Sequence, residues 1–206
     1  QEQEIRRGNK VFYRGYIEEQ PVIVTKSGMG KVNAAMCAQT LALRYHVDYM
    51  INTGVAGCTC DDLNVLDIVL SQDLVFHDFD WEIMEDYHPH TSKFPGDPGL
   101  IALAQRALEQ MPQRKYQYKL GRIATGDIFV DDEALRRSII ERTHPDCVEM
   151  EGAAIALVAY SNQIPCLVIR SMSDNANGDA GMSFDTFETI AADHSANLLL
   201  TMLELA

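Results

Sequence analysis

Short apolar runs alternate with amphipathic segments along the chain, and this alternation predicts an α/β fold. The runs expected to form strands are 11–16, 22–25, 49–52, 65–70, 74–76, 119–124, 148–151 and 166–169. The segments with helical spacing are 31–46, 100–111, 132–143, an alanine-rich stretch after Glu151, and 184–205. No linker, internal repeat or low-complexity tract interrupts this pattern, so residues 1–206 are expected to form one domain.

The helical segments also predict which side chains face the core. The expected buried face of the first helix consists of Val32, Ala35, Met36 and Leu43. The helix at 100–111 has a clear apolar face made of Leu100, Leu103, Ala104, Ala107, Leu108 and Met111. Ser183 is the expected N-cap of the last helix. One side of that helix carries Phe187, Ala191, His194 and Leu198.

The segment from Cys147 to Asp174 predicts a strand, a helix and a second strand, which together form a βαβ unit. Polar side chains cluster where each strand ends, namely Glu149, Glu151, Arg170, Ser173 and Asp174. The carboxyl ends of strands line the ligand crevice in such sheets, so we expect these side chains to meet there. Carboxylates in different surroundings can then take different roles. The alternative is an acid that complements a helix N-terminus, or Asp174 in a turn.

Turns of small residues are expected after the predicted strands, at 27–31, 53–57 and 125–130. Glycines in such turns let the backbone approach a ligand closely. The first turn lacks the spacing of the G-x-G-x-x-G dinucleotide fingerprint. A tight turn without a ligand is the alternative for 53–57. Phe129 is suited to stacking on a flat base, or else it is a core side chain.

The segment 77–98 is polar and aromatic and shows little periodicity. We expect a solvated loop or a subunit contact here, because long loops in compact domains are commonly functional. Trp81 and Tyr87 would suit an interface. A metal site at His77, Asp78 and Asp80 is the alternative, but no further ligands stand at a fixed spacing.

Composition narrows the possible partners. The 206 residues are 47% hydrophobic and carry a net charge of −13, which argues against nucleic acid or an anionic membrane as a partner. No apolar run approaches the roughly 18 residues of a transmembrane helix. Five cysteines, mostly in apolar segments, indicate free thiols in a reducing, cytoplasmic compartment. Cys58 and Cys60 lack a second pair at metal-ligand spacing, so no zinc site is expected.

An ordered set of motifs carries a family resemblance: SGMGKVNAA, NTGVAG, TGDIFV, VEMEG and RSMSDNA. Together they resemble the bacterial 5'-methylthioadenosine/S-adenosylhomocysteine nucleosidases, within the purine nucleoside phosphorylase superfamily. The resemblance implies a three-layer α/β sandwich with a central mixed β-sheet, usually in a homodimer. It also implies hydrolysis of the N-glycosidic bond of an adenine nucleoside, without a metal or organic cofactor, to adenine and a 5-thio-substituted ribose.

The resemblance assigns roles to residues in these motifs. Asp174 corresponds to the aspartate that hydrogen-bonds adenine and protonates the leaving base. Glu151 corresponds to the glutamate that holds the ribose hydroxyls, and Met150 to a methionine that packs on the ribose. Phe129 corresponds to the aromatic side chain that stacks on adenine, and Val130 to the residue whose backbone reads the adenine edge.

The remaining implied site residues surround these groups. Ala56 and Gly57 line the same pocket, and Met29 lies on the 5' side of the sugar. Arg170 and Ser173 support the acid and the water site, and Phe184 belongs to the segment that closes over the base. The region from Trp81 to Phe94 corresponds to one that caps a neighbouring subunit's 5'-substituent pocket.

Two departures from the family pattern keep other functions open. The family's water-activating glutamate follows the first strand of its sheet, and both would lie upstream of Gln1. We therefore expect a natural segment before Gln1, because loss of that internal strand would leave unpaired backbone groups and a hole. A nucleoside-binding protein without turnover is one alternative. Val55 stands where many members have serine, and its lack of a hydroxyl favours water as the nucleophile over the phosphate of a purine nucleoside phosphorylase, the other alternative.

Overall fold

The computed structural model describes residues 3–17, 19–111, 115–176 and 180–206, except for the side chains of 180–185. Its larger β-sheet has six strands in the order β6-β5-β7-β8-β4-β9. These strands are β4 (Met50–Cys58), β5 (Ile68–Phe76), β6 (Lys93–Pro95), β7 (Tyr118–Thr125), β8 (Cys147–Glu149) and β9 (Cys166–Asp174). The sheet is mixed, because β9 and β7 run parallel to their neighbours β4 and β5, whereas β8 runs antiparallel to β4. Strand β5 also pairs with β9, so the sheet curves back on itself.

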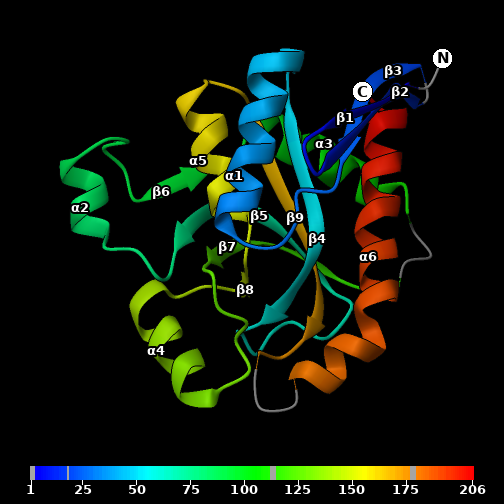
Figure 1. The fold of residues 1–206 in the computed structure, drawn as a ribbon. Coiled ribbons are helices and arrows are strands. Elements are labelled where there is room, and N and C mark those ends of the chain that lie inside the picture. Colours follow the sequence, from blue (N-terminus) through cyan, green and yellow to red (C-terminus); the bar gives the residue numbers. More distant parts are fainter. Residues whose placement is uncertain (1–2, 18, 112–114, 177–179) are drawn as a thin grey trace.

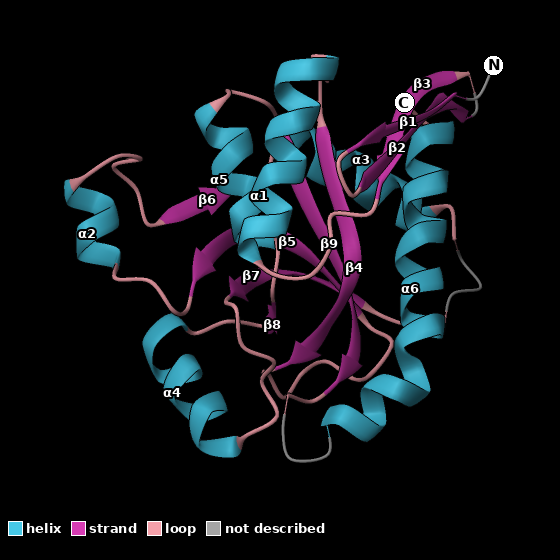
Figure 2. Ribbon diagram, viewed as in Figure 1, coloured by secondary structure: helices cyan, strands magenta, loops and turns pink. Residues whose placement is uncertain are grey.

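Helices cover both faces of this sheet (Figures 1 and 2). Helices α1 (Lys31–Thr40) and α5 (Gly152–Ser161) pack together on one face. Helices α3 (Pro98–Glu109) and α6 (Ala180–Glu204) pack on the other. Each face has its own buried apolar cluster against the sheet. The predicted three-layer α/β sandwich with a central mixed sheet is confirmed.

Side-chain chemistry determines where several helices begin. Asp97 caps α3 by accepting a hydrogen bond from the Leu100 amide, and Pro98 occupies the first turn. Asp132 caps α4 (Glu133–Thr143) in the same way. Asp80 caps α2 (Trp81–Asp86).

A small antiparallel sheet of β1 (Gln3–Arg7), β2 (Lys10–Ile17) and β3 (Gln20–Thr25) lies apart from the six-stranded sheet (Figure 1). A cavity of about 730 Å³ separates the two sheets. Its walls come from β2, β3, α1, the first residues of β4 and the end of α6. In the described residues, Met50–Val55 of β4 pair with β9 on one side and with no strand on the other.

The predicted buried face of α1 is wrong except at Ala35, which packs partly buried against the core. The exposed fractions of Val32, Met36 and Leu43 are 69%, 61% and 61%. The buried side of this segment consists instead of small residues, Ala34, Cys37, Ala38 and Ala42. Small side chains let α1 lie close against α5, and the larger apolar residues point away from the core. The α-helix also ends at Thr40 and continues as a π-helical turn, Leu41–Tyr45, rather than running regularly to residue 46.

The expected turn at 53–57 is also wrong, because β4 continues through these residues to Cys58. Their small size allows side chains of the neighbouring strand β9 to lie close to the backbone of β4. A side chain at Gly54 would overlap the Arg170 guanidinium, and a Cβ at Gly57 would lie 2.8 Å from Asp174 Oδ1. Strand β9 likewise extends beyond 169 and includes Asp174.

Two smaller expectations need correction. The segment 77–98 is not a continuous loop, since it contains α2 and the short strand β6. Ser183 does not cap the last helix, because α6 is already helical at Ala180. Ala191 and Leu198 of that helix are fully buried, as predicted.

Candidate active site

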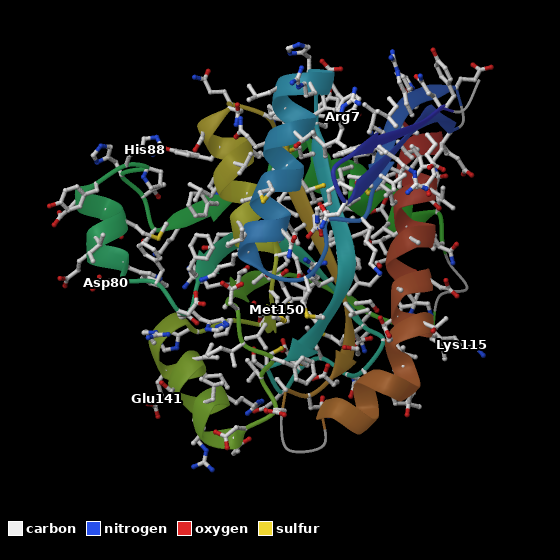
Figure 3. All side chains as sticks on the ribbon, viewed as in Figure 1. Arg7, Asp80, His88, Lys115, Glu141 and Met150 are labelled. Carbon is white, nitrogen blue, oxygen red and sulfur yellow. The ribbon has the colours of Figure 1, made fainter. Side chains whose placement is uncertain are left out.

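The register of the larger sheet brings the ends of four strands into one row. Thr125 at the end of β7 lies opposite Glu149 at the end of β8. Val148 of β8 lies opposite Gly57 of β4, and Gly57 lies opposite Asp174 at the end of β9. The polar strand ends therefore meet along one part of the sheet. The predicted βαβ unit is wrong, however, because β8 and β9 lie on opposite sides of β4 and run in opposite directions. Glu149 still lies near Asp174 because β8 has only three residues and pairs with the end of β4. Figure 3 labels Met150, which follows β8 directly and lies among these strand ends.

Glu149 and Arg170 form the buried centre of the site, with side-chain exposures of 2% and 3%. The Arg170 guanidinium donates to Glu149 and to Asn52 Oδ1. Thr125 Oγ1 donates to Glu149 Oε1. Glu149 Oε2, which accepts from Arg170, also accepts the backbone amides of Glu151 and Gly152 at 3.0 and 2.7 Å. Glu149 thereby fixes the start of α5, where an anionic group is favourable.

Glu151 is held between the glycine loop before α1 and strand β9. Its Oε1 accepts the Gly30 amide at 2.9 Å, and its Oε2 lies 3.7 Å from Arg170 Nη2. Burial, followed by repulsion from Glu149, raises the pKa of Glu151, although Arg170 and the Gly30 amide oppose this shift. The glycine loop before α1 is therefore joined to the residue that the resemblance assigns to ribose.

Asp174 is only 2% exposed. Burial raises the pKa of its carboxyl, although hydrogen bonds from Ser173 Oγ and the Ala176 amide, both at 2.7 Å, act in the opposite direction. The Ser173 hydroxyl also lies 3.4 Å from the carbonyl oxygen of Ala56. A buried acid with a raised pKa is suited to proton donation near neutral pH.

The other predicted site residues differ in how far their side chains are exposed to solvent. Val130 is buried and belongs to one apolar cluster with Ala176 and Val148, which joins the loop after β7 to the segment after β9. Met150 is partly buried. Phe129 and Met29 are 42% and 72% exposed. The side chain of Phe184 lies outside the described residues.

Arg170 contacts both glutamates rather than Asp174, whereas Ser173 donates a hydrogen bond to Asp174. Several residues near the site were given no role from the sequence, namely Lys31, Asn52, Thr125 and Asp127. These residues lie within or directly beside the small-residue segments 27–31, 53–57 and 125–130, and this position is the signal that could have indicated them.

The structure does not assemble the alternative metal site at His77, Asp78 and Asp80. His77 is buried, Asp78 pairs with Lys31, and Asp80 caps α2. Cys60, Asp62 and Asp146 do come together, with ligand atoms within 4.8 Å of one another. The Lys119 ammonium already lies between the two carboxylates, 2.7 Å from Asp62 and 2.8 Å from Asp146, so it balances one of their two negative charges.

Known proteins with a similar sequence and fold identify the family. A family model described as "Phosphorylase superfamily" matches residues 1–204. The 5'-methylthioadenosine/S-adenosylhomocysteine nucleosidase of Staphylococcus carnosus is 37% identical over 209 residues, covering 98% of this chain and 90% of the relative. The chain belongs to the 5'-methylthioadenosine/S-adenosylhomocysteine nucleosidase family.

Solved structures agree with this nucleosidase assignment. The Colwellia psychrerythraea nucleosidase in complex with adenine superposes with a TM-score of 0.92 and 33% identity, covering 98% of this chain and 85% of that one. Futalosine hydrolase of Helicobacter pylori superposes with a TM-score of 0.90 and 32% identity, covering 99% of this chain and 88% of that one. In this member of the nucleosidase family, no described helix is long and apolar enough to cross a bilayer. All five cysteines are free thiols.

Proposed function

We propose that this chain hydrolyses the N-glycosidic bond of 5'-methylthioadenosine and S-adenosylhomocysteine, releasing adenine and a 5-thio-substituted ribose. The observation that carries the proposal is the buried carboxyl of Asp174, with its raised pKa, in the same row of strand ends as the Glu149–Arg170–Glu151 cluster. Adenine is a poor leaving group until N7 is protonated. Asp174 supplies that proton, a role that is typically worth ~10²–10⁴-fold in rate.

Positive charge then develops on the ribose ring, where nearby carboxylate stabilises it. Glu151 holds the ribose hydroxyls, and Met150 packs on the sugar. Phe129 stacks on adenine while the Val130 backbone reads its edge. Ala56 and Gly57 complete the wall beside Asp174.

The outer groups have supporting roles. Ser173 orients Asp174, and Arg170 orients the glutamates. Met29 faces the 5' substituent, and Phe184 closes over the base. Water is the nucleophile, in agreement with the apolar Val55. The role of activating this water is assigned to no residue of 1–206.

We further propose that the protein works as a cytoplasmic homodimer. The support is a set of solvent-exposed apolar residues, Val32 and Met36 on α1 and Leu43 in the π-helical turn that follows it. Val32 and Met36 are four residues apart and share one face of α1. Tyr87, just after α2, is also 69% exposed and suits an interface.

The test is a substrate panel with product identification by chromatography. The chain is incubated with 5'-methylthioadenosine, S-adenosylhomocysteine and futalosine, each beside Asp174→Asn prepared identically to exclude a contaminating hydrolase. Release of adenine and the thio-ribose from the first two substrates by the unsubstituted chain supports the proposal. Turnover of futalosine alone would show that the proposed substrates are wrong and that futalosine is the substrate. Tight nucleoside binding without release from any of them would favour a binding protein.

A further inference from the structure

A charged cluster links the two glycine loops that frame the site. Lys31 Nζ lies 2.7 Å from both carboxylate oxygens of Asp78 and 3.5 Å from Asp127 Oδ2. The Lys31 amide donates to Asp127 Oδ1 at 2.8 Å, and the Asp127 amide donates to Asp78 Oδ2 at 2.9 Å. We call Lys31, Asp78 and Asp127 the loop clamp.

The clamp joins segments that are distant in sequence. Lys31 begins α1, Asp78 follows β5, and Asp127 follows β7. Gly30 has no side chain to cap α1, and its φ of +87° belongs to the left-handed region that glycine adopts readily. The Asp127 carboxylate reaches the first turn of α1 from another loop and supplies the missing acceptor.

Charge and burial indicate that the Lys31–Asp78 ion pair of the clamp stays formed in water at neutral pH. The Lys31 and Asp78 side chains are 21% and 22% exposed, so water screens their interaction only in part. Burial acts to raise the pKa of Asp78, but the hydrogen bonds from Lys31 and the Asp127 amide outweigh it, and the pKa is lowered. Asp78 is therefore ionised at neutral pH, and the pair is held.

The clamp is connected to the site on both sides. On one side, the Gly30 amide next to Lys31 donates to Glu151 Oε1. On the other, Phe129 and Val130 follow Asp127 by two and three residues. We infer that Lys31 and Asp78 are positioning residues, which touch no substrate but hold the Gly30 amide against Glu151 and thereby set recognition of the ribose hydroxyls. This inference rests on the proposed role of Glu151.

The experiment measures discrimination, defined as kcat/KM for 5'-methylthioadenosine divided by kcat/KM for its 2'-deoxy analogue. The clamp variants are Lys31→Met, Asp78→Asn and the double variant. The matched controls are Lys119→Met and Asp62→Asn, since Lys119 Nζ contacts both Asp62 oxygens at 2.7 and 3.0 Å in a pair that contacts none of the site residues. Lys31→Arg tests rescue by retained charge.

We expect each clamp variant to lower discrimination on the order of tenfold, because a hydrogen bond to a charged group is weakened. The double variant should lower it no further, Lys31→Arg should restore part of it, and the controls should leave it unchanged. Equal losses of kcat/KM on both substrates, or no loss, would overturn the inference. If Asp78→Asn does not fold, Lys31→Met and Lys31→Arg decide alone.

A failure of the proposed function can be told apart from a failure of the loop-clamp inference. It is judged on adenine release by the unsubstituted chain, whereas the clamp is judged on a ratio between variants. If the unsubstituted chain does not turn over, the same ratio is taken from the Kd values of hydrolysis-resistant ribo and 2'-deoxy analogues, with the same expected and contradicting results.

Discussion

At the scale of single residues, the account depends most on Asp174. Its carboxyl is buried at the end of β9, and its oxygens are held by Ser173 and the Ala176 amide. Replacing Asp174 with asparagine keeps the shape but removes the transferable proton. We expect Asp174→Asn to lower kcat by on the order of 10²-fold or more, measured by adenine release. Near-normal turnover would remove Asp174 from the role of acid.

The raised pKa of Asp174 also has a consequence for stability. The folded protein binds this proton more tightly than the unfolded chain does. The stabilisation is therefore fully present below the ordinary pKa of 3.8 and is lost as pH rises through the folded-state value. We expect the Tm of Asp174→Asn, relative to that of the unsubstituted chain, to be higher at pH 8 than at pH 4. A Tm difference that is the same at both pH values would contradict a raised pKa.

At the scale of elements, Glu149 links β7, β8, β9 and the start of α5. Glu149→Gln leaves the buried Arg170 charge without its main counter-charge. Breaking a buried ion pair from one side costs about 3 kcal/mol or more in the free energy of unfolding. Urea unfolding measures this loss.

Glu133→Gln is the matched control for that measurement, because Glu133 pairs with Arg137 on the exposed face of α4. We expect its free energy of unfolding to change by less than about 0.5 kcal/mol. Equal effects of the two substitutions would show that the Glu149 cluster has no special weight in the fold.

The elements also show how far the sequence could predict this molecule. Acids at the ends of two predicted strands correctly indicated that these side chains lie close together. The βαβ unit given as the reason was wrong, because β8 runs antiparallel to β4 whereas β9 runs parallel to it. The small residues at 53–57 were misinterpreted as a turn, since close packing of Gly54 and Gly57 against β9 requires the same residue types.

Other features depend on contacts that no local pattern contains. The buried face of α1 was assigned to the wrong side because both sides carry apolar residues, and periodicity alone does not say which side faces α5. The Glu149–Arg170 pair spans 21 positions, and the Lys31–Asp78 pair spans 47. Such pairings follow from the sheet register, which the sequence did not predict residue by residue.

At the scale of the whole molecule, the exposed apolar residues of α1 and of the turn after it bear on assembly. Met36→Glu places a charge in the proposed interface, where burial without a partner is costly. We expect this variant to sediment as a monomer while the unsubstituted chain sediments as a dimer. Ile190→Glu, an exposed apolar position on α6, should leave the dimer intact. A monomeric unsubstituted chain would refute the dimer proposal.

The most direct test of the central claim is adenine release from 5'-methylthioadenosine by this chain, with and without inorganic phosphate. The account predicts release at the same rate in both conditions, with free thio-ribose as the second product, because water is the nucleophile. Release that requires phosphate and yields a sugar phosphate would contradict it and identify a phosphorylase.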